Sequence, residues 1–203
     1  MRPIACFLAV MLIAGTISAE DDGVKWESSA SLYGYAVPDS EDYLNPNVTT
    51  DHGRLHLEGR HNYEGVGTWS LWMGANFHAG TKWSFDATAM FGGVFGDFEG
   101  LAPGYRIYLE RSWFSLASEG EYFIDTHDHE GNYFYAWTEV AGAPTDWFRA
   151  GLAGQRTRAY ASDLDIQRGP FVGFTYKMLD VAAYAFNLDQ DDPTYVLAVR
   201  VEF

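Results

Sequence analysis

The sequence predicts an all-β protein that folds as a single antiparallel transmembrane β-barrel. Three observations indicate either this fold or, as the alternative, a soluble secreted β protein. Apolar and polar residues alternate along most of the chain, which is the period of a strand with two different faces. After residue 19 no apolar run approaches the length of about 20 residues that a membrane-spanning helix needs. Tight connections also alternate with longer, more polar ones. We expect twelve strands, with ten as the alternative.

The N-terminus has the pattern of a secretory signal peptide. Arg2 precedes an unbroken apolar run over residues 4–14, and small residues lead up to Ala19. We therefore expect a signal peptide at 1–19 and a single barrel domain at 20–203. The only cysteine, Cys6, lies inside the signal peptide. Disulfides and thiolate metal sites are thereby excluded from the barrel.

The charge balance is strongly acidic. Residues 1–19 hold one arginine and no acidic residue, so residues 20–203 have 12 basic and 28 acidic residues and a net charge of −16. The absence of a basic stripe argues against a nucleic-acid partner. Acidic residues gather in segments that resemble loops, at 39–42, 125–130, 163–165 and 189–192. They form either a solvated rim or sites for divalent cations that bridge to lipid headgroups. Their spacing fits no dedicated calcium loop, and we expect no cofactor.

The number of strands depends on the region around Pro46. The clear alternating segments are 25–37, 54–63, 69–78, 83–91, 105–111, 114–125, 133–141, 147–156, 171–178, 181–188 and 195–203. These are eleven, whereas a barrel with both termini on the periplasmic side has an even number. Reading 43–50 as a strand gives twelve, although Pro46 removes a ladder donor. The alternative keeps ten strands and leaves 20–52 as an extension.

The last nine residues carry the strongest single indication. Tyr195, Val201 and Phe203 belong to a face that is apolar or aromatic throughout, and Arg200 and Glu202 belong to the other. This segment resembles the C-terminal recognition strand of bacterial outer-membrane proteins. The resemblance implies an outer-membrane location and recognition of Tyr195–Phe203 by the barrel-assembly machinery. Segments 92–97, 102–105, 144–149 and 163–169 resemble small outer-membrane barrel proteins of an uncharacterised family, which implies no catalytic residue.

The connections and the aromatic residues predict an orientation in the membrane. The connections at 79–82, 112–113, 143–146 and 179–180 are tight, and those at 96–104, 126–132 and 157–168 are longer. Barrels of this class have short periplasmic turns and longer external loops. Aromatic residues near strand ends predict two girdles at the membrane interfaces. They are Trp26, Trp69, Trp83, Tyr105, Trp113, Tyr133, Trp147 and Tyr195.

If the apolar face meets lipid, the opposite face lines the lumen with charges of both signs. Such a set forms either an ion-pair network that closes the interior or a narrow hydrated pore. Ten to twelve strands lie between the filled eight-stranded barrel and the open porins with 16–18 strands. We therefore expect a structural or narrow-pore role. The expected lumen-lining residues are Arg54, His56, Glu58, Arg60, Asp86, Arg106, Glu110, Glu119, Glu121, Arg149, Gln155, Lys177, Arg200 and Glu202.

The histidines raise two further hypotheses. His56, between Arg54 and Glu58, is a candidate pH-sensitive gate, since histidine titrates near neutral pH. Barrel enzymes such as outer-membrane phospholipase A and the omptins place a histidine beside Ser, Asp or Glu, but none of their motifs occurs in this chain. His127 and His129 fit a polar loop better than a metal site. The alternatives to a pore are a lipid-modifying or hydrolytic enzyme and a surface binding module that uses the acidic loops. Outer-membrane lipids and lipopolysaccharide are the expected partners.

Overall fold

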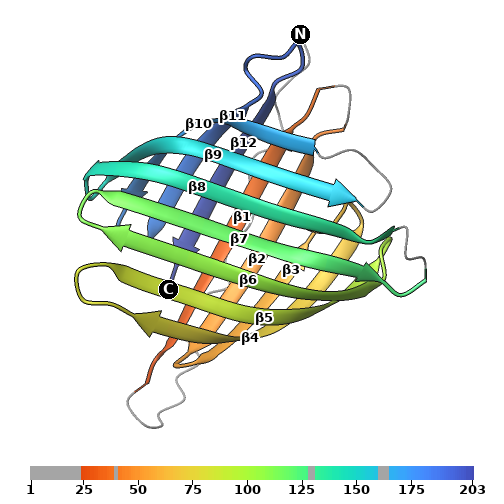
Figure 1. Cartoon of the computed structure of the whole chain (residues 1–203), viewed down its shortest axis with the longest axis horizontal. Coiled ribbons are helices and arrows are strands. Elements are labelled where there is room, and N and C mark those ends of the chain that lie inside the picture. Colours follow the sequence, from red (N-terminus) through yellow and green to blue (C-terminus); the bar gives the residue numbers. More distant parts are fainter. Residues whose placement is uncertain (1–23, 39–40, 128–130, 160–164) are drawn as a thin grey trace.

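The computed structural model describes residues 24–38, 41–127, 131–159 and 165–203, and these form a closed barrel (Figure 1). The expected signal peptide at 1–19 lies outside the described residues. Within them, no helix is long and apolar enough to cross a membrane. The strands are β1 (Trp26–Ala36), β2 (Tyr43–His52), β3 (Leu55–His61), β4 (Thr68–Ala79), β5 (Ser84–Gly96), β6 (Gly100–Arg111), β7 (Phe114–Asp125), β8 (Tyr133–Thr145), β9 (Phe148–Ala159), β10 (Asp165–Tyr176), β11 (Leu179–Phe186) and β12 (Thr194–Glu202).

The barrel has the simplest possible topology. Every strand pairs antiparallel with its neighbour in the chain, and β12 pairs with β1 to close the sheet. At this seam the register runs from Ser29 opposite Glu202 to Ala36 opposite Tyr195. The C-terminal strand singled out in the sequence is therefore one side of the closing seam. The predicted all-β, twelve-stranded antiparallel barrel is confirmed.

Pro46 is accommodated because β2 is paired unevenly. On one side, β2 pairs with β1 over its whole length, from Tyr43 to His52, and Pro46 is opposite Leu32. On the other side, β2 pairs with the shorter β3 only from Asn47 onward, where Asn47 is opposite Arg60. Pro46 thus lies in a half of β2 that has a ladder partner on one side only, where the missing N–H costs least. The ten-stranded alternative, with residues 20–52 as an extension, is wrong.

The connections differ in length between the two ends of the barrel, as predicted, but several boundaries move. Turns 112–113 and 177–178 are tight two-residue hairpins, and Ser112 and Lys177 adopt the positive φ of 55° that such turns favour. The predicted loop 96–104 shrinks to 97–99 because β5 runs to Gly96 and β6 starts at Gly100. The predicted turn 143–146 is mostly strand, since β8 continues to Thr145 through a register shift. The tight turns that follow β4, β6 and β8 gather at the left end in Figure 1.

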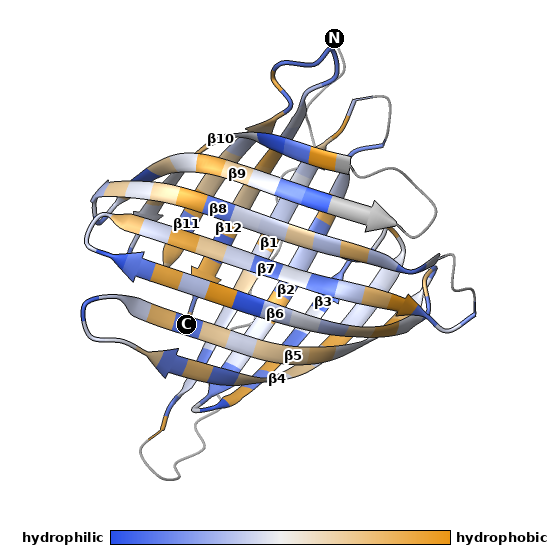
Figure 2. Cartoon of the chain, in the orientation of Figure 1, coloured by the Kyte–Doolittle hydropathy of each residue, from blue (hydrophilic) through white to orange (hydrophobic). Residues whose placement is uncertain are grey.

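Hydrophobic and hydrophilic residues alternate along the strands (Figure 2), and many of the large hydrophobic side chains are exposed on the outside of the barrel. On β4, for example, Trp69, Leu71 and Met73 are 53%, 64% and 63% exposed, while Ser70 and Trp72 between them are buried. Trp26, Trp83, Trp113, Trp147 and Tyr195 are exposed as the girdle prediction requires. Tyr133 departs from it, because it packs inside the barrel against Phe123. Tyr105 also departs, because β6 begins earlier than expected and leaves it in mid-strand.

The interior has two differently composed sides. Along β8 to β12 and β1, aromatic and small apolar side chains form one cluster. It contains Tyr35, Trp137, Ala141, Ala153, Phe171, Ala182, Tyr184, Phe186, Val196 and Ala198. A smaller cluster around Trp72 and Phe123 lies near β4 to β7. Charged residues of β3, β6 and β7 lie beside this second cluster, so the lumen has an aromatic side and a charged side.

Candidate functional site

Among the described residues, two cavities in the lumen share a group of tyrosines in their lining. The larger has a volume of about 640 Å³ and the smaller about 290 Å³. Both are lined by Tyr35, Asn45, Tyr63 and Tyr135, which we call the tyrosine constriction. Tyr63 meets Tyr135 edge-on, with ring centroids 5.5 Å apart. The constriction is therefore the shared boundary of two cavities inside the barrel, each large enough to hold several water molecules.

Tyr63 reaches the lumen because the connection 62–67, which we call the inward loop, folds into the barrel. The alternation of β3 would place Tyr63 on the outer, apolar face. Asn62 interrupts it with a φ of 60°, and Gly67, with a φ of 82°, returns the chain to β4. The Asn62 side chain fixes this shape by donating to the Leu44 carbonyl at 2.8 Å and accepting from the Gly67 N–H at 2.9 Å. The alternation predicted over segment 54–63 assigns Tyr63 to the face of Leu55 and Leu57, and the inward loop is the reason that this assignment is wrong.

Three hydrogen bonds hold the inward loop against the barrel wall. The Tyr63 hydroxyl donates to Glu119 Oε1 at 2.5 Å. The Ser70 hydroxyl donates to Glu64 Oε1 at 2.5 Å, and the Tyr133 hydroxyl donates to the Glu64 carbonyl at 2.9 Å. Glu64 is only 7% exposed. The loop is thus attached to β4, β7 and β8, and its Tyr63 is part of the constriction.

Arg60 is the centre of a buried charge cluster beside the loop. Its guanidinium donates from Nε to Glu58 Oε1 at 2.9 Å and from Nη1 to Glu121 Oε2 at 2.7 Å. Arg106 also donates to Glu58 Oε1, at 2.6 Å, and lies 3.3 Å from Glu119. The side chains of Arg60, Glu58 and Glu121 are at most 2% exposed. Carboxylates and guanidinium groups taken out of water need such close partners.

Aromatic rings enclose the Arg60 guanidinium. Its Cζ lies 4.1 Å from the Tyr63 ring centroid and 4.3 Å from that of Trp72. The Trp72 indole in turn lies over glycines of β5 and β6. A Cβ on Gly92 would be 2.5 Å from the indole, and a Cβ on Gly104 would be 2.9 Å from it. The glycines therefore make room for Trp72, Trp72 supports Arg60, and Arg60 binds the acidic side chains of β3 and β7.

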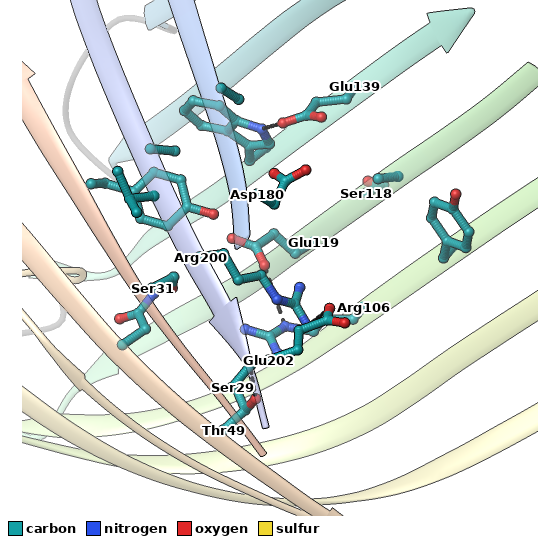
Figure 3. A pocket seen from close by; sticks show the side chains of 18 of the residues that line it. Ser29, Ser31, Thr49, Arg106, Ser118, Glu119, Glu139, Asp180, Arg200 and Glu202 are labelled. Carbon is teal, nitrogen blue, oxygen red and sulfur yellow. Dashed lines mark hydrogen bonds and ion pairs between the residues drawn. The ribbon is translucent and has the colours of Figure 1, made fainter. Parts of the chain in front are cut away.

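The opposite side of the larger cavity combines aromatic rings with a second set of charges. Arg149 makes a bidentate contact with Asp180, at 2.5 and 2.8 Å, and the Thr175 hydroxyl donates to the same carboxylate. Glu139 Oε1 accepts from the Trp137 indole N–H and from the Tyr184 hydroxyl, each at 2.8 Å. Figure 3 shows Glu139, Asp180, Arg106, Glu119, Arg200 and Glu202 around this space.

The structure distributes the residues that we expected in the lumen over several places. Seven of them line the larger cavity, namely Asp86, Arg106, Glu119, Arg149, Lys177, Arg200 and Glu202. Gln155 lines the smaller cavity. His56, Glu58, Arg60 and Glu121 belong to the buried cluster and line neither cavity. Glu110 is exposed, where it accepts a hydrogen bond from the Tyr108 hydroxyl at 2.8 Å.

Arg54 does not take the lumenal place we expected. It lies in the turn between β2 and β3 rather than in a strand, and its guanidinium is 5.4 Å from the ring of Phe77. Phe77 is on the exposed apolar face of β4. Because a turn does not continue the alternation of the strand, the position of Arg54 two residues before His56 does not put both side chains on the same face.

His56 is enclosed by carboxylates. Its Nδ1 lies 2.8 Å from Asp51 and its Nε2 lies 3.4 Å from Glu58, and the residue is 3% exposed. Because the ring is shielded from both cavities, we expect the His56→Gln variant to keep the wild-type dependence of conductance on pH between about 5 and 8, the range in which histidine titrates. Single-channel recording at both pH values checks this. A flatter profile in the variant would restore His56 as a gate.

Sequence reasoning missed four residues of this site. Tyr63 and Glu64 were missed because no periodicity signals a loop that folds inward. Glu139 and Asp180 share their faces with lumenal aromatic and small residues, so the pairing of β8 with β9 and β10 with β11 was needed to find them. In the described ranges no three His, Cys, Asp or Glu side chains form a group that could hold a metal ion. His127 lies 3.7 Å from Glu99, and His129 lies outside the described residues.

Comparison with known proteins identifies the fold. No family model and no curated protein sequence matches the chain. Among solved structures, the KdgM porin superposes with a TM-score of 0.59 at 11% identity, over 86% of this chain and 99% of that one. The KdgM porin in complex with disordered oligogalacturonate gives 0.59 at 10%. The outer membrane protein Omp33 of Acinetobacter baumannii gives 0.50 at 10%, over 90% and 100%.

The chain has the fold of an outer-membrane porin barrel. The KdgM and Omp33 chains are matched over almost their full length, so the likeness covers the whole barrel and not a few strands. This confirms the small outer-membrane-type barrel that the C-terminal strand led us to expect. At identities near 10% the likeness extends to the fold and carries no residue of a binding site.

Proposed function

We propose that this protein is a narrow channel for small hydrophilic solutes in the bacterial outer membrane. The observation that carries the proposal is the pair of cavities in the lumen, which meet at the tyrosine constriction. A barrel that served only as a structural element would gain stability by filling this space with side chains. The proteins with the same fold that are described as porins support the proposal.

The polar lining of the cavities favours water inside the barrel. The amide oxygens of Asn45 and Asn47 are buried and have no hydrogen-bond partner among the described residues. Both residues line the larger cavity. Buried carbonyl oxygens in proteins are nearly always hydrogen-bonded, so water is the partner that the cavity would supply. A hydrated lumen is the first requirement of a channel.

The proposed membrane orientation follows from the outer surface. The exposed apolar side chains of β4 and its neighbours fit the hydrocarbon layer, and the tight turns fit the periplasmic side. Lipids and lipopolysaccharide would then contact the outer face. The C-terminal segment Tyr195–Phe203, which contains most of the seam strand β12, would be recognised by the barrel-assembly machinery. Recovery of the protein in the outer-membrane fraction, with heat-modifiable migration on a gel, tests this location.

Hydrolysis is less well supported than conduction by the arrangement of the histidines. In a nucleophilic triad the histidine lies between the nucleophile and the acid. At the rim of the barrel the order is different, because Ser84 and His78 both contact Asp86, at 3.4 and 2.7 Å. The contacts of the His56 ring nitrogens, in turn, are with carboxylates.

Enlarging the constriction should increase conduction. We expect the Tyr63→Ala variant to give single-channel steps in a planar lipid bilayer that are roughly twofold larger than those of the wild type, since the narrowest segment dominates the resistance of a hydrated pore. Liposome swelling should likewise admit larger sugars. The matched control is Tyr122→Ala, which removes a tyrosine from the outer face of β7. Silence of both the wild type and Tyr63→Ala, in barrels shown to be folded, would reject a channel.

A further inference from the structure

Glu139 stands apart from the other acidic residues around the larger cavity. The cavity is lined by four basic residues, Arg106, Arg149, Lys177 and Arg200, and five acidic residues, Asp86, Glu119, Glu139, Asp180 and Glu202. Arg149 pairs with Asp180, Arg106 with Glu119 and Arg200 with Glu202 at 3.2 Å. Within the described part of the chain, Glu139 has no basic group within ion-pair distance. It is a lumenal carboxylate held by neutral donors only.

Those donors leave one side of the carboxylate open. The Trp137 indole and the Tyr184 hydroxyl both bind Oε1, and Oε2 has no hydrogen bond to any described residue. Glu139 is half-buried and borders the larger cavity, and Oε2 is not among the atoms that the described residues bury completely without a partner. The two hydrogen bonds therefore fix the orientation of the carboxylate while one oxygen stays accessible from the lumen (Figure 3).

Aromatic rings surround the same position. Trp137 meets Tyr184 edge-on at 5.1 Å and Tyr33 edge-on at 6.3 Å. All three residues line the larger cavity with Glu139. Aromatic faces attract cations through the ring quadrupole, most strongly when water is excluded. A rigid carboxylate among tyrosine and tryptophan rings is the arrangement that binds substituted ammonium groups.

We infer that Glu139, together with Tyr33, Trp137 and Tyr184, forms a subsite for a small organic cation in the lumen. This inference rests on the proposed function, because the ligand must enter the barrel, and it specifies the solute class as substituted ammonium compounds. An anion would be repelled by the carboxylate, and a neutral solute would gain nothing from it. Arg149 faces the same cavity, but its charge is offset by its bidentate contact with Asp180.

The charge of the barrel ends favours the same class of solute. The connections opposite the tight turns contain Asp97 and Glu99 between β5 and β6, and Asp191 and Asp192 between β11 and β12, beside the ion pair of Asp189 with Arg168. A rim of one sign raises the local concentration of ions of the other sign. Cations would therefore be enriched at the mouth through which external solutes enter.

The test compares choline with 3,3-dimethylbutan-1-ol, which has the same shape but a carbon in place of the charged nitrogen. Isothermal titration of the detergent-folded barrel should show choline binding at least about tenfold tighter than the neutral analogue. Glu139→Gln should weaken choline binding by about tenfold, because it keeps the size and hydrogen bonding of the side chain and removes its charge. Glu110→Gln is the matched control, since it makes the same change at an exposed position that lines neither cavity.

The outcomes separate this inference from the proposed function. Equal binding of the two ligands, no binding of choline, or unchanged choline binding by Glu139→Gln would each overturn the cation subsite. Single-channel steps in potassium chloride would still stand as evidence for a channel in those cases. Choline binding that depends on Glu139 in a barrel without conductance would keep the subsite and reject the channel. Heat-modifiable migration of every variant shows that the barrel has folded.

Discussion

Replacing Arg60 by leucine should destabilise the barrel more than any other single change in the charge cluster. The substitution would leave the buried carboxylates of Glu58 and Glu121 without the guanidinium that binds both. Breaking a buried ion pair by removing one partner costs about 3–5 kcal/mol. The loss of the ring contacts with Tyr63 and Trp72 acts in the same direction. The free energy of unfolding in urea, followed by tryptophan fluorescence of the detergent-folded protein, measures the effect.

The matched control is Arg168→Leu. Arg168 is on the barrel surface with its side chain 74% exposed, and its ion pair with Asp189 is 3.4 Å long. Exposed ion pairs contribute about 0–1 kcal/mol, so this variant should unfold close to the wild type. If Arg60→Leu also unfolds at the wild-type urea concentration, the cluster does not need its arginine and our account of it fails.

The fold could be predicted from the sequence because each strand carries its own signal. The alternation in 69–78 separates an outer face of Trp69, Leu71 and Met73 from an inner face, and this needs no knowledge of neighbouring strands. Pro46 was the point of doubt, and the structure resolves it through the short β3, which leaves that part of β2 paired on one side. Strand length, unlike strand type, depends on the partner, so boundaries such as Gly96 and Gly100 were misplaced.

The candidate site was only partly accessible from the sequence. The alternation of side chains along a strand identifies residues such as Arg106 and Glu119 as inward-facing. The two are opposite each other in the register of β6 and β7. This alternation ends where the chain leaves the strand, and Tyr63 and Arg54 were assigned to the wrong faces because they lie in connections. It also does not say which inward-facing charges pair. Glu139 is distinguished by the absence of an ion pair among the described residues, a property of the folded barrel alone.

The second large effect is expected at Gly151, on β9. This glycine is opposite Ala141 on β8, close to the register shift between Gly142 and Thr145. A Cβ at Gly151 would overlap the carbonyl oxygen of Val140 and lie 2.8 Å from the Ala141 Cα. These are backbone atoms, which cannot turn aside as a side-chain end can. The absence of a Cβ at Gly151 is what permits the two backbones to lie this close.

We therefore expect Gly151→Ala to lower the free energy of unfolding by about 3 kcal/mol, the upper part of the usual range for overpacking. Gly93→Ala provides the control, because a Cβ there meets no atom within 4 Å. That variant should differ from the wild type by less than about 0.5 kcal/mol. Urea titrations of both variants under the same conditions measure the difference. Equal stability of the two would show that β8 and β9 can separate at this point at no cost, in which case their close approach does not depend on glycine at position 151.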